Sequence, residues 1–209
     1  GTPTTVPIDL SWRPQASSGR VIVHAGRLWD GKGPAVKTDV DIVIEGNRIQ
    51  KVRPHQAAGG DPGDKTARFI DASALTVIPG LWESHTHEWI SGKFYGDRLG
   101  RLWMVYSVTS LNSVGDPVYR AAETREAFTS GQRVGPRFFA TGEAIDGERI
   151  YYNFMRPTNG SDEQFEREIS RAQALDYDMV KTYVRLRHED NAKITQRVHD
   201  RMKVWTASH

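Results

Sequence analysis

From about residue 75 onward, short apolar runs alternate with polar segments of helical spacing. The apolar runs are rich in β-branched and aromatic residues, which favours strands, and the polar segments show the 3.6-residue periodicity of helices. Pro117 and the pair Ser161 and Gln164 have the character of helix starts. Regular alternation of this kind predicts an α/β fold with a parallel sheet flanked by helices. The predicted strands are 75–84, interrupted by Pro79-Gly80, and 107–114, 137–141, 179–184 and 204–209. The predicted helices are 97–106, 117–129, 161–175 and 189–203.

The segment before this alternation has a different character. Gly46-Asn47 separates two β-branched runs, which predicts a hairpin with a tight turn. Residues 20–75 are therefore predicted to form a small β unit, and residues 1–19, rich in Thr, Pro and Ser, a linker. The predicted strands of the β unit are 20–24, 40–45, 48–52 and 68–71.

Length and composition narrow the possible classes. The chain has 209 residues, whereas a complete (β/α)8 barrel needs about 250. The net charge of +2 and the scattered basic residues argue against a nucleic-acid partner. No apolar run reaches the roughly 18 residues of a membrane span. We therefore expect a soluble protein, either cytoplasmic or secreted, whose compartment the sequence leaves open.

The absence of cysteine limits any metal site to nitrogen and oxygen ligands. The strongest such signal is His85-Thr86-His87 at the end of an apolar strand. Side chains two residues apart on a strand point to the same side, so both imidazoles can reach one metal ion. Parallel-sheet enzymes place catalytic groups at this end of their strands. Two exposed loop histidines are an equally weighted alternative.

Lys181 lies inside an apolar strand, where a charged amine is costly to bury. Burial favours the neutral amine, which can react with carbon dioxide to give a carbamate whose two oxygens can bridge two cations. Taken alone, the residue is more simply interpreted as a lysine whose amine reaches water at the strand end. His209 ends the fifth predicted strand, and alone it is equally well explained as an accident of the terminus.

Together these features resemble the amidohydrolase superfamily. Val23–Gly31 and Asp41–Ile49 resemble the opening of its small β-sandwich, and Val77–His87 is similar to its first barrel strand, with Pro-Gly-Leu and paired histidines. Lys181 and His209 lie where the binuclear, carboxylated-lysine members carry ligands on strands four and five. The resemblance implies the N-terminal portion of a TIM (β/α)8 barrel over residues 76–209, preceded by part of a β-sandwich over residues 20–75.

The resemblance also implies a mechanism and a cofactor. Two divalent ions, zinc in the first instance, would be held by His85 and His87 on one side and by His209 on the other, with the Lys181 carbamate as the bridge. A metal-bound hydroxide would cleave an amide bond in a peptide or a cyclic amide. The family's strand-six histidine and strand-eight aspartate lie beyond His209. A second polypeptide or a remaining C-terminal segment is therefore expected to complete the barrel, and both chain ends are expected to be cuts.

Other assignments are weaker. Pro7–Pro14 resembles the linker that follows an upstream β-propeller in some members. Five residues are candidates for contact with a small-molecule or peptide substrate, although a solvated or structural role is the simpler interpretation of each: Glu88, Tyr151, Tyr152, Arg156 and Arg185. Hydrolysis of an ester, lactone or phosphoester is an alternative, because one metal pair serves several electrophiles. A non-catalytic scaffold is another, and the metal content of the protein distinguishes it from an enzyme.

Overall fold

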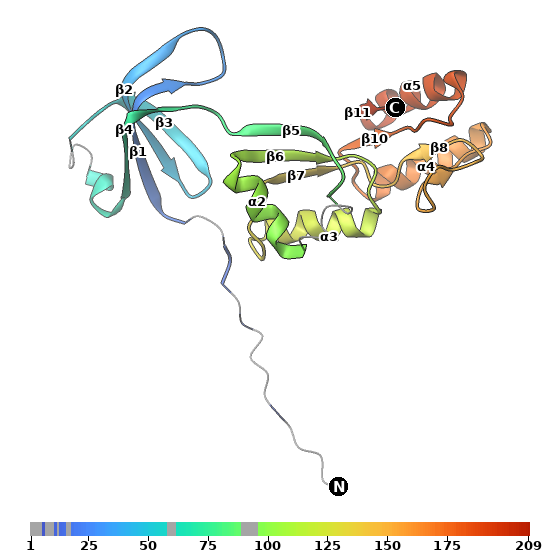
Figure 1. The fold of residues 1–209 in the computed structure, drawn as a ribbon, viewed down its shortest axis with the longest axis horizontal. Coiled ribbons are helices and arrows are strands. Elements are labelled where there is room, and N and C mark those ends of the chain that lie inside the picture. The colour runs from blue at the N-terminus through green and yellow to red at the C-terminus, as the bar shows by residue number, and fades with distance from the viewer. Residues whose placement is uncertain (1–5, 7–10, 12, 16–17, 58–61, 89–95) are drawn as a thin grey trace. The chain divides into compact units, whose positions relative to one another are not determined.

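The computed structural model describes residues 6, 11, 13–15, 18–57, 62–88 and 96–209. The chain divides into two compact units, one of residues 13–80 and one that contains residues 81–209 (Figure 1). Most of the predicted linker, including much of the segment compared with a propeller linker, lies outside the described residues. The predicted boundaries of the linker, the sandwich portion and the barrel portion stay predictions.

The first unit is a four-stranded sheet in the order β3-β2-β1-β4. The predicted hairpin is confirmed, because Glu45 pairs with Arg48 across the two-residue turn and Gly46 has a φ of 56°. Ala25, Leu28, Val40 and Ile42 form the core. The strands are longer than predicted: β1 (Arg20–Trp29), β2 (Val36–Glu45), β3 (Arg48–Pro54) and β4 (Arg68–Val77), with a short 3-10 helix, η1 (Pro62–Thr66), before β4.

Neighbouring strands of this sheet approach closely at Gly26. A Cβ atom there would lie 1.8 Å from the Ser73 carbonyl oxygen, so this position accepts only glycine. The parallel pairing of β1 with β4 shifts register between Ala25 and Arg27, which places Gly26 at the irregularity. The glycine therefore allows the two strands to pair.

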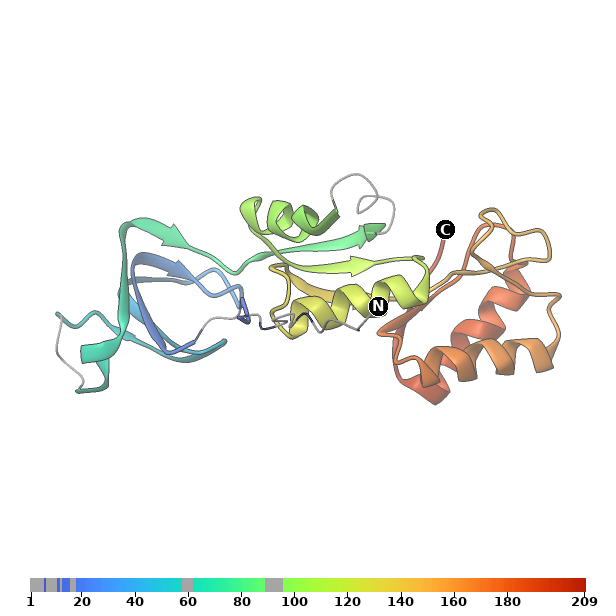
Figure 2. The ribbon, with the colours of Figure 1, turned by 90° about the horizontal axis from the view of Figure 1, so that it is seen from below.

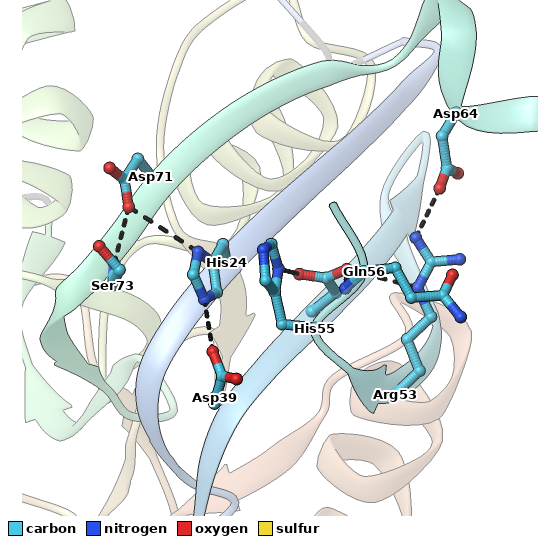
Figure 3. Close-up of polar contacts among 9 residues, drawn as sticks. His24, Asp39, Arg53, His55, Gln56, Asp64, Asp71 and Ser73 are labelled. Carbon is cyan, nitrogen blue, oxygen red and sulfur yellow. Dashed lines mark hydrogen bonds and ion pairs between the residues drawn. The ribbon is translucent and has the colours of Figure 1, made fainter. Parts of the chain in front are cut away.

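A polar cluster crosses the same sheet (Figure 3). The rings of His24 and His55 are stacked, with centroids 3.6 Å apart. His24 Nε2 lies 2.9 Å from Asp39 Oδ1, and His55 Nδ1 lies 2.7 Å from Oδ1 of the fully buried Asp41. Burial alone would raise the pKa of Asp41, but the hydrogen bonds from His55 and the backbone amide of Gln56 hold it below its usual value. Both histidines are thus tied to carboxylates within the sheet.

The second unit alternates strands with helices, so the predicted α/β class is confirmed. Strands β5, β6 and β7 form one parallel sheet, β10 and β11 pair in parallel, and β8 pairs with β9. No closed barrel forms among residues 81–88 and 96–209. The strands are β5 (Leu81–Thr86), β6 (Val108–Ser113), β7 (Arg137–Ala140), β8 (Ile145–Asp146), β9 (Arg156–Pro157), β10 (Met179–Lys181) and β11 (Trp205–Ala207).

In the described part of this unit the helices are η2 (Gly96–Arg98), α2 (Leu99–Val105), α3 (Val118–Thr129), α4 (Asp162–Ala174) and α5 (His188–Met202). The capping position predicted at Ser161 is confirmed, since its side chain accepts a hydrogen bond from the Gln164 amide. Pro117 is the residue before α3, with a ψ of 126°, and not its first helical residue as predicted. None of the helices among the described residues is long and apolar enough to cross a membrane.

Helices α4 and α5 lie side by side (Figure 2) and cover β10. Ile194 and Val198 of α5 are fully buried against Phe165 and Ile169 of α4 and Val180 of β10. The helical periodicity of α4 and α5 places these side chains on one face of each helix, and together they form a large apolar cluster of the second unit. The cluster fixes the strand that carries Lys181.

The strands differ from the predictions at three places. The interruption predicted at Pro79-Gly80 separates two strands, since β4 ends at Val77 and β5 begins at Leu81 in the other unit. The predicted strand 179–184 ends at Lys181, after which only Thr182 makes an isolated bridge, to Ile145. Strands β8 and β9 were not predicted, since two-residue strands are too short to show periodicity.

Candidate active site

The ends of three strands bring the predicted ligands together. His85 lies in β5 and His87 directly after it, Lys181 is the last residue of β10, and His209 follows β11. Lys181 pairs with Ala207 of the neighbouring parallel strand. His209 therefore follows two residues after the position that lies opposite Lys181. The ring of His85 lies 5.4 Å from that of His87 and 5.2 Å from that of His209, between centroids.

Lys181 is the most deeply buried residue of this group. Its side chain is 0% exposed, and its Nζ atom lies 2.7 Å from Nδ1 of His209. Burial lowers the pKa of Lys181 to about 8, because the apolar surroundings disfavour the ammonium form. The expectation that burial favours the neutral amine therefore has a structural basis, and the amine does not extend to water.

The three histidines share this electrostatic setting. Burial lowers the pKa of His85, His87 and His209, and the positive charge of Lys181, where its amine is protonated, lowers each of them further. All three imidazoles are therefore held toward the neutral form, which is the form that binds metal ions.

The donor set can be compared with what a metal ion needs. Within the part of the chain that the structure describes, no group of three or more His, Cys, Asp or Glu side chains could by itself hold a metal ion. The group here includes a lysine amine, whose Nζ atom lies 2.7 Å from His209 Nδ1, and Lys181 lines one cavity together with His87. If the lysine contributed anionic oxygens, the group would offer nitrogen and oxygen donors, which zinc accepts.

A small cavity adjoins the group. It has a volume of about 30 Å³ and is lined by His87, Lys181, Tyr152, Tyr183 and Met155, among others. That volume is enough for one water molecule. The buried amine of Lys181 therefore faces a confined space bordered by aromatic rings.

The five candidate substrate residues divide into two groups. Tyr151 and Tyr152 lie beside the site, and both rings contact Tyr183, with centroids 5.9 and 6.1 Å from it. The guanidinium of Arg156 is paired with Glu168 of α4 through two hydrogen bonds of 3.0 and 3.2 Å. That pairing ties β9 to the helix, so the structure gives Arg156 a partner within the fold.

Glu88 and Arg185 also have partners within the chain. Glu88 is buried and accepts a hydrogen bond of 3.1 Å from the Trp103 indole. Burial raises the pKa of Glu88 to about 7, against the lowering effect of that bond. The Arg185 guanidinium donates to the carbonyl oxygens of Arg149 and Ile150, at 3.1 and 2.9 Å.

Two residues of the site were not singled out from the sequence. Tyr183, two residues after Lys181, has its ring 5.1 Å from that of His209 and 5.9 Å from the Lys181 amine. Asp146 is fully buried, and its carboxylate accepts three backbone hydrogen bonds, from Gly147, Tyr151 and Arg185. The spacing of Tyr183 from Lys181 was a usable signal, whereas the partners of Asp146 lie up to 39 residues away in sequence.

Comparison with known proteins gives one relative and several structures. No family model matches the chain. Enamidase of Eubacterium barkeri is 33% identical over 107 residues, which cover 48% of this chain and 26% of that protein. A Xaa-Pro dipeptidase crystallised with methionine in its active site has a TM-score of 0.72 and 20% identity, covering 91% of this chain and 56% of its own. The structure of an amidohydrolase matches with a TM-score of 0.72 and 17% identity, and the match covers 91% of this chain and 56% of that one.

The chain thus spans about a quarter of its curated relative and about half the length of these structures. The structural likeness extends over nearly all of the chain, although sequence identity is low. The resemblance to the amidohydrolase superfamily that the sequence predicted is therefore confirmed, and the chain has the fold of part of these proteins.

Proposed function

We propose that the chain supplies part of the active site of a metal-dependent hydrolase that cleaves an amide bond in a peptide or a cyclic amide. The relative named enamidase and the structural neighbour named Xaa-Pro dipeptidase support C–N bond hydrolysis over the ester, lactone or phosphoester alternatives. Since the chain spans only part of each, the activity is proposed for the whole protein.

The proposed architecture is the first portion of a (β/α)8 barrel preceded by part of a β-sandwich. Parallel pairing within β5-β6-β7 and between β10 and β11, with helices between the strands, supports the barrel portion. A remaining C-terminal segment or a second polypeptide would complete it. Large apolar side chains on the strands of the second unit, such as Leu81, Trp82 and Trp205, are more than half exposed, as expected of surface that further strands would cover.

The observation that carries the proposal is the fully buried Lys181 amine within 2.7 Å of His209 and close to His85 and His87. Addition of its neutral Nζ to the carbon of carbon dioxide, with loss of one proton, would give a carbamate. This would convert the buried neutral amine into an anion with two oxygen donors. The three imidazoles beside it would be a suitable setting for that anion once cations are bound.

The proposed ligand roles follow from this arrangement. His85 and His87 would hold one divalent ion, His209 the other, and the Lys181 carbamate both. Bound there, two ions, expected to be zinc, would acidify a water molecule and polarise the amide carbonyl. The chain's own contribution is to keep the imidazoles neutral, to hold the lysine away from bulk water and to position all four side chains at strand ends.

Hydrolysis by the whole protein tests the proposal. Amide cleavage should be lost on removal of divalent ions, return with zinc, and fall at least a thousandfold in Lys181→Ala. Lys193→Ala is the matched control, because that lysine lies on the exposed face of α5. Full activity of Lys181→Ala, or activity indifferent to metal removal, would show that the proposal is wrong.

A further inference from the structure

Four aromatic rings gather on one side of the candidate site, and we refer to them as the aromatic wall. Tyr151 and Tyr152 have ring centroids 4.8 Å apart, and each lies about 6 Å from Tyr183. Phe154 stacks on Tyr152, with centroids 5.6 Å apart. Tyr151 and Tyr152 keep 55% and 40% of their surface exposed, so the wall presents open aromatic faces.

The aromatic wall adjoins the proposed ligands directly. Tyr183 contacts both His209 and Lys181, and Tyr152 and Phe154 line the same small cavity as Lys181 and His87. A group bound to the wall would therefore lie next to the proposed reaction centre. Exposed aromatic faces beside polar groups of this kind are typical of ligand pockets.

The wall is held in place by polar contacts within the chain. The buried Asp146 carboxylate accepts hydrogen bonds from the backbone amides of Gly147, Tyr151 and Arg185, at 2.9, 2.9 and 2.8 Å. Arg185 in turn donates to two carbonyl oxygens of the same segment. These bonds join the backbone of the segment that carries Tyr151 to the segment that follows Lys181, and so hold the two segments that carry the rings together.

Charge decides which kind of group the wall accepts. The Arg185 guanidinium already lies 5.3 Å from the Tyr151 ring centroid. A cationic side chain would meet this positive charge at the Tyr151 ring, which removes the advantage of a cation–π contact there. A neutral aromatic or large apolar side chain meets no such opposition and gains ring-to-ring contact.

From these contacts we infer that the aromatic wall is the subsite for a neutral aromatic or large apolar side chain of the amide substrate. The inference rests on the proposed function, because it assigns the substrate class of the same site. Tyr151, Tyr152, Phe154 and Tyr183 form the contact surface, and Asp146 positions it.

Three N-acetyl amino acids with one amide bond each test this in the whole protein. N-acetyl-L-phenylalanine should be hydrolysed with a kcat/KM at least tenfold above that of N-acetyl-L-alanine, and N-acetyl-L-lysine should not exceed the alanine compound. Tyr152→Ala should bring the phenylalanine-to-alanine ratio close to one. Tyr119→Ala, which removes an exposed tyrosine from α3, is the control and should leave the ratio unchanged. Tyr152→Leu replaces Tyr152→Ala if the latter does not fold.

Calorimetric binding of the same three compounds separates this inference from the proposed function. Suppose that N-acetyl-L-phenylalanine binds selectively, that Tyr152→Ala weakens this binding at least fivefold, and that no compound is hydrolysed. The subsite assignment would then stand and the proposed hydrolase function would be wrong. Hydrolysis with a phenylalanine-to-alanine ratio near one, or a ratio unchanged in Tyr152→Ala, would overturn the subsite assignment and leave the proposed function standing. Neither hydrolysis nor selective binding would overturn both.

Discussion

Replacing Asp146 by alanine should destabilise the second unit more than any comparable loss of a surface carboxylate. The Asp146 side chain is fully buried and accepts backbone hydrogen bonds from Gly147, Tyr151 and Arg185. Alanine would leave three amide donors without this acceptor, and each unsatisfied buried donor costs about 1–3 kcal/mol. Because Tyr151 is partly exposed, water can replace the lost acceptor for its amide. We therefore expect a total loss of roughly 3–5 kcal/mol, in the lower part of the range that three donors give.

Urea denaturation followed by circular dichroism measures this loss. A loss of roughly 3–5 kcal/mol is a large part of the total stability of a domain, which is about 5–15 kcal/mol. Asp146→Asn keeps a carbonyl acceptor and should lose about half as much. Asp200→Ala is the control, because its carboxylate accepts only exposed side-chain hydrogen bonds from Gln196 among the described contacts. A loss below about 1 kcal/mol in Asp146→Ala would refute the role given to this carboxylate.

Three further substitutions test other parts of the structure. Burial raises the pKa of Glu88 from 4.5 to about 7. Between those pH values the carboxyl group loses its proton in the unfolded state but keeps it in the folded state. The free energy of unfolding should therefore fall by up to about 3 kcal/mol as the pH rises from 4.5 to 7. Glu88→Gln keeps an acceptor for Trp103 and should abolish that fall in urea titrations at pH 4.5 and 7.5; an unchanged pH profile would contradict the assignment. Ser161→Ala removes the cap of α4 and should cost about 1 kcal/mol, with Ser161→Asp restoring most of it; equal urea midpoints for all three proteins would argue against the cap. Gly26→Ala forces a Cβ against the Ser73 carbonyl and should cost more than about 2 kcal/mol; a thermal midpoint equal to that of the parent would show that the approach of the two strands is not as close as described.

Local pattern was enough to predict much of the fold. The hairpin at Gly46-Asn47 and the cap at Ser161 each depend on residues close in sequence, and both are confirmed. The periodicity that predicted the helix over 189–203 depends on helix geometry alone, which places Ile194 and Val198 on one face, and both side chains are buried. Elements of two residues, such as β8 and β9, carry no such pattern and were missed.

The candidate site was predicted only in part, for the same reason. Lys181 and the His85-Thr86-His87 run could be singled out because each lies within or at the end of an otherwise apolar strand. Their proximity could be expected because parallel strands bring their carboxyl ends together. The partners of Asp146, and the pairing of Arg156 with Glu168, depend on tertiary contacts that no local pattern records. For that reason the sequence suggested Arg156 as a substrate residue, whereas the structure gives it a partner on α4.

The central claim is that Lys181 becomes a carbamate that joins two metal ions with His85, His87 and His209. Natively purified whole protein, equilibrated with ¹³C-labelled bicarbonate and zinc, allows the metal content and the ¹³C NMR spectrum to be measured on one sample. We expect about two zinc ions per molecule and a carbamate carbon signal. Lys181→Ala should abolish both, and Lys193→Ala should retain both. A protein that binds no metal, or that binds two ions without a carbamate signal, would contradict it.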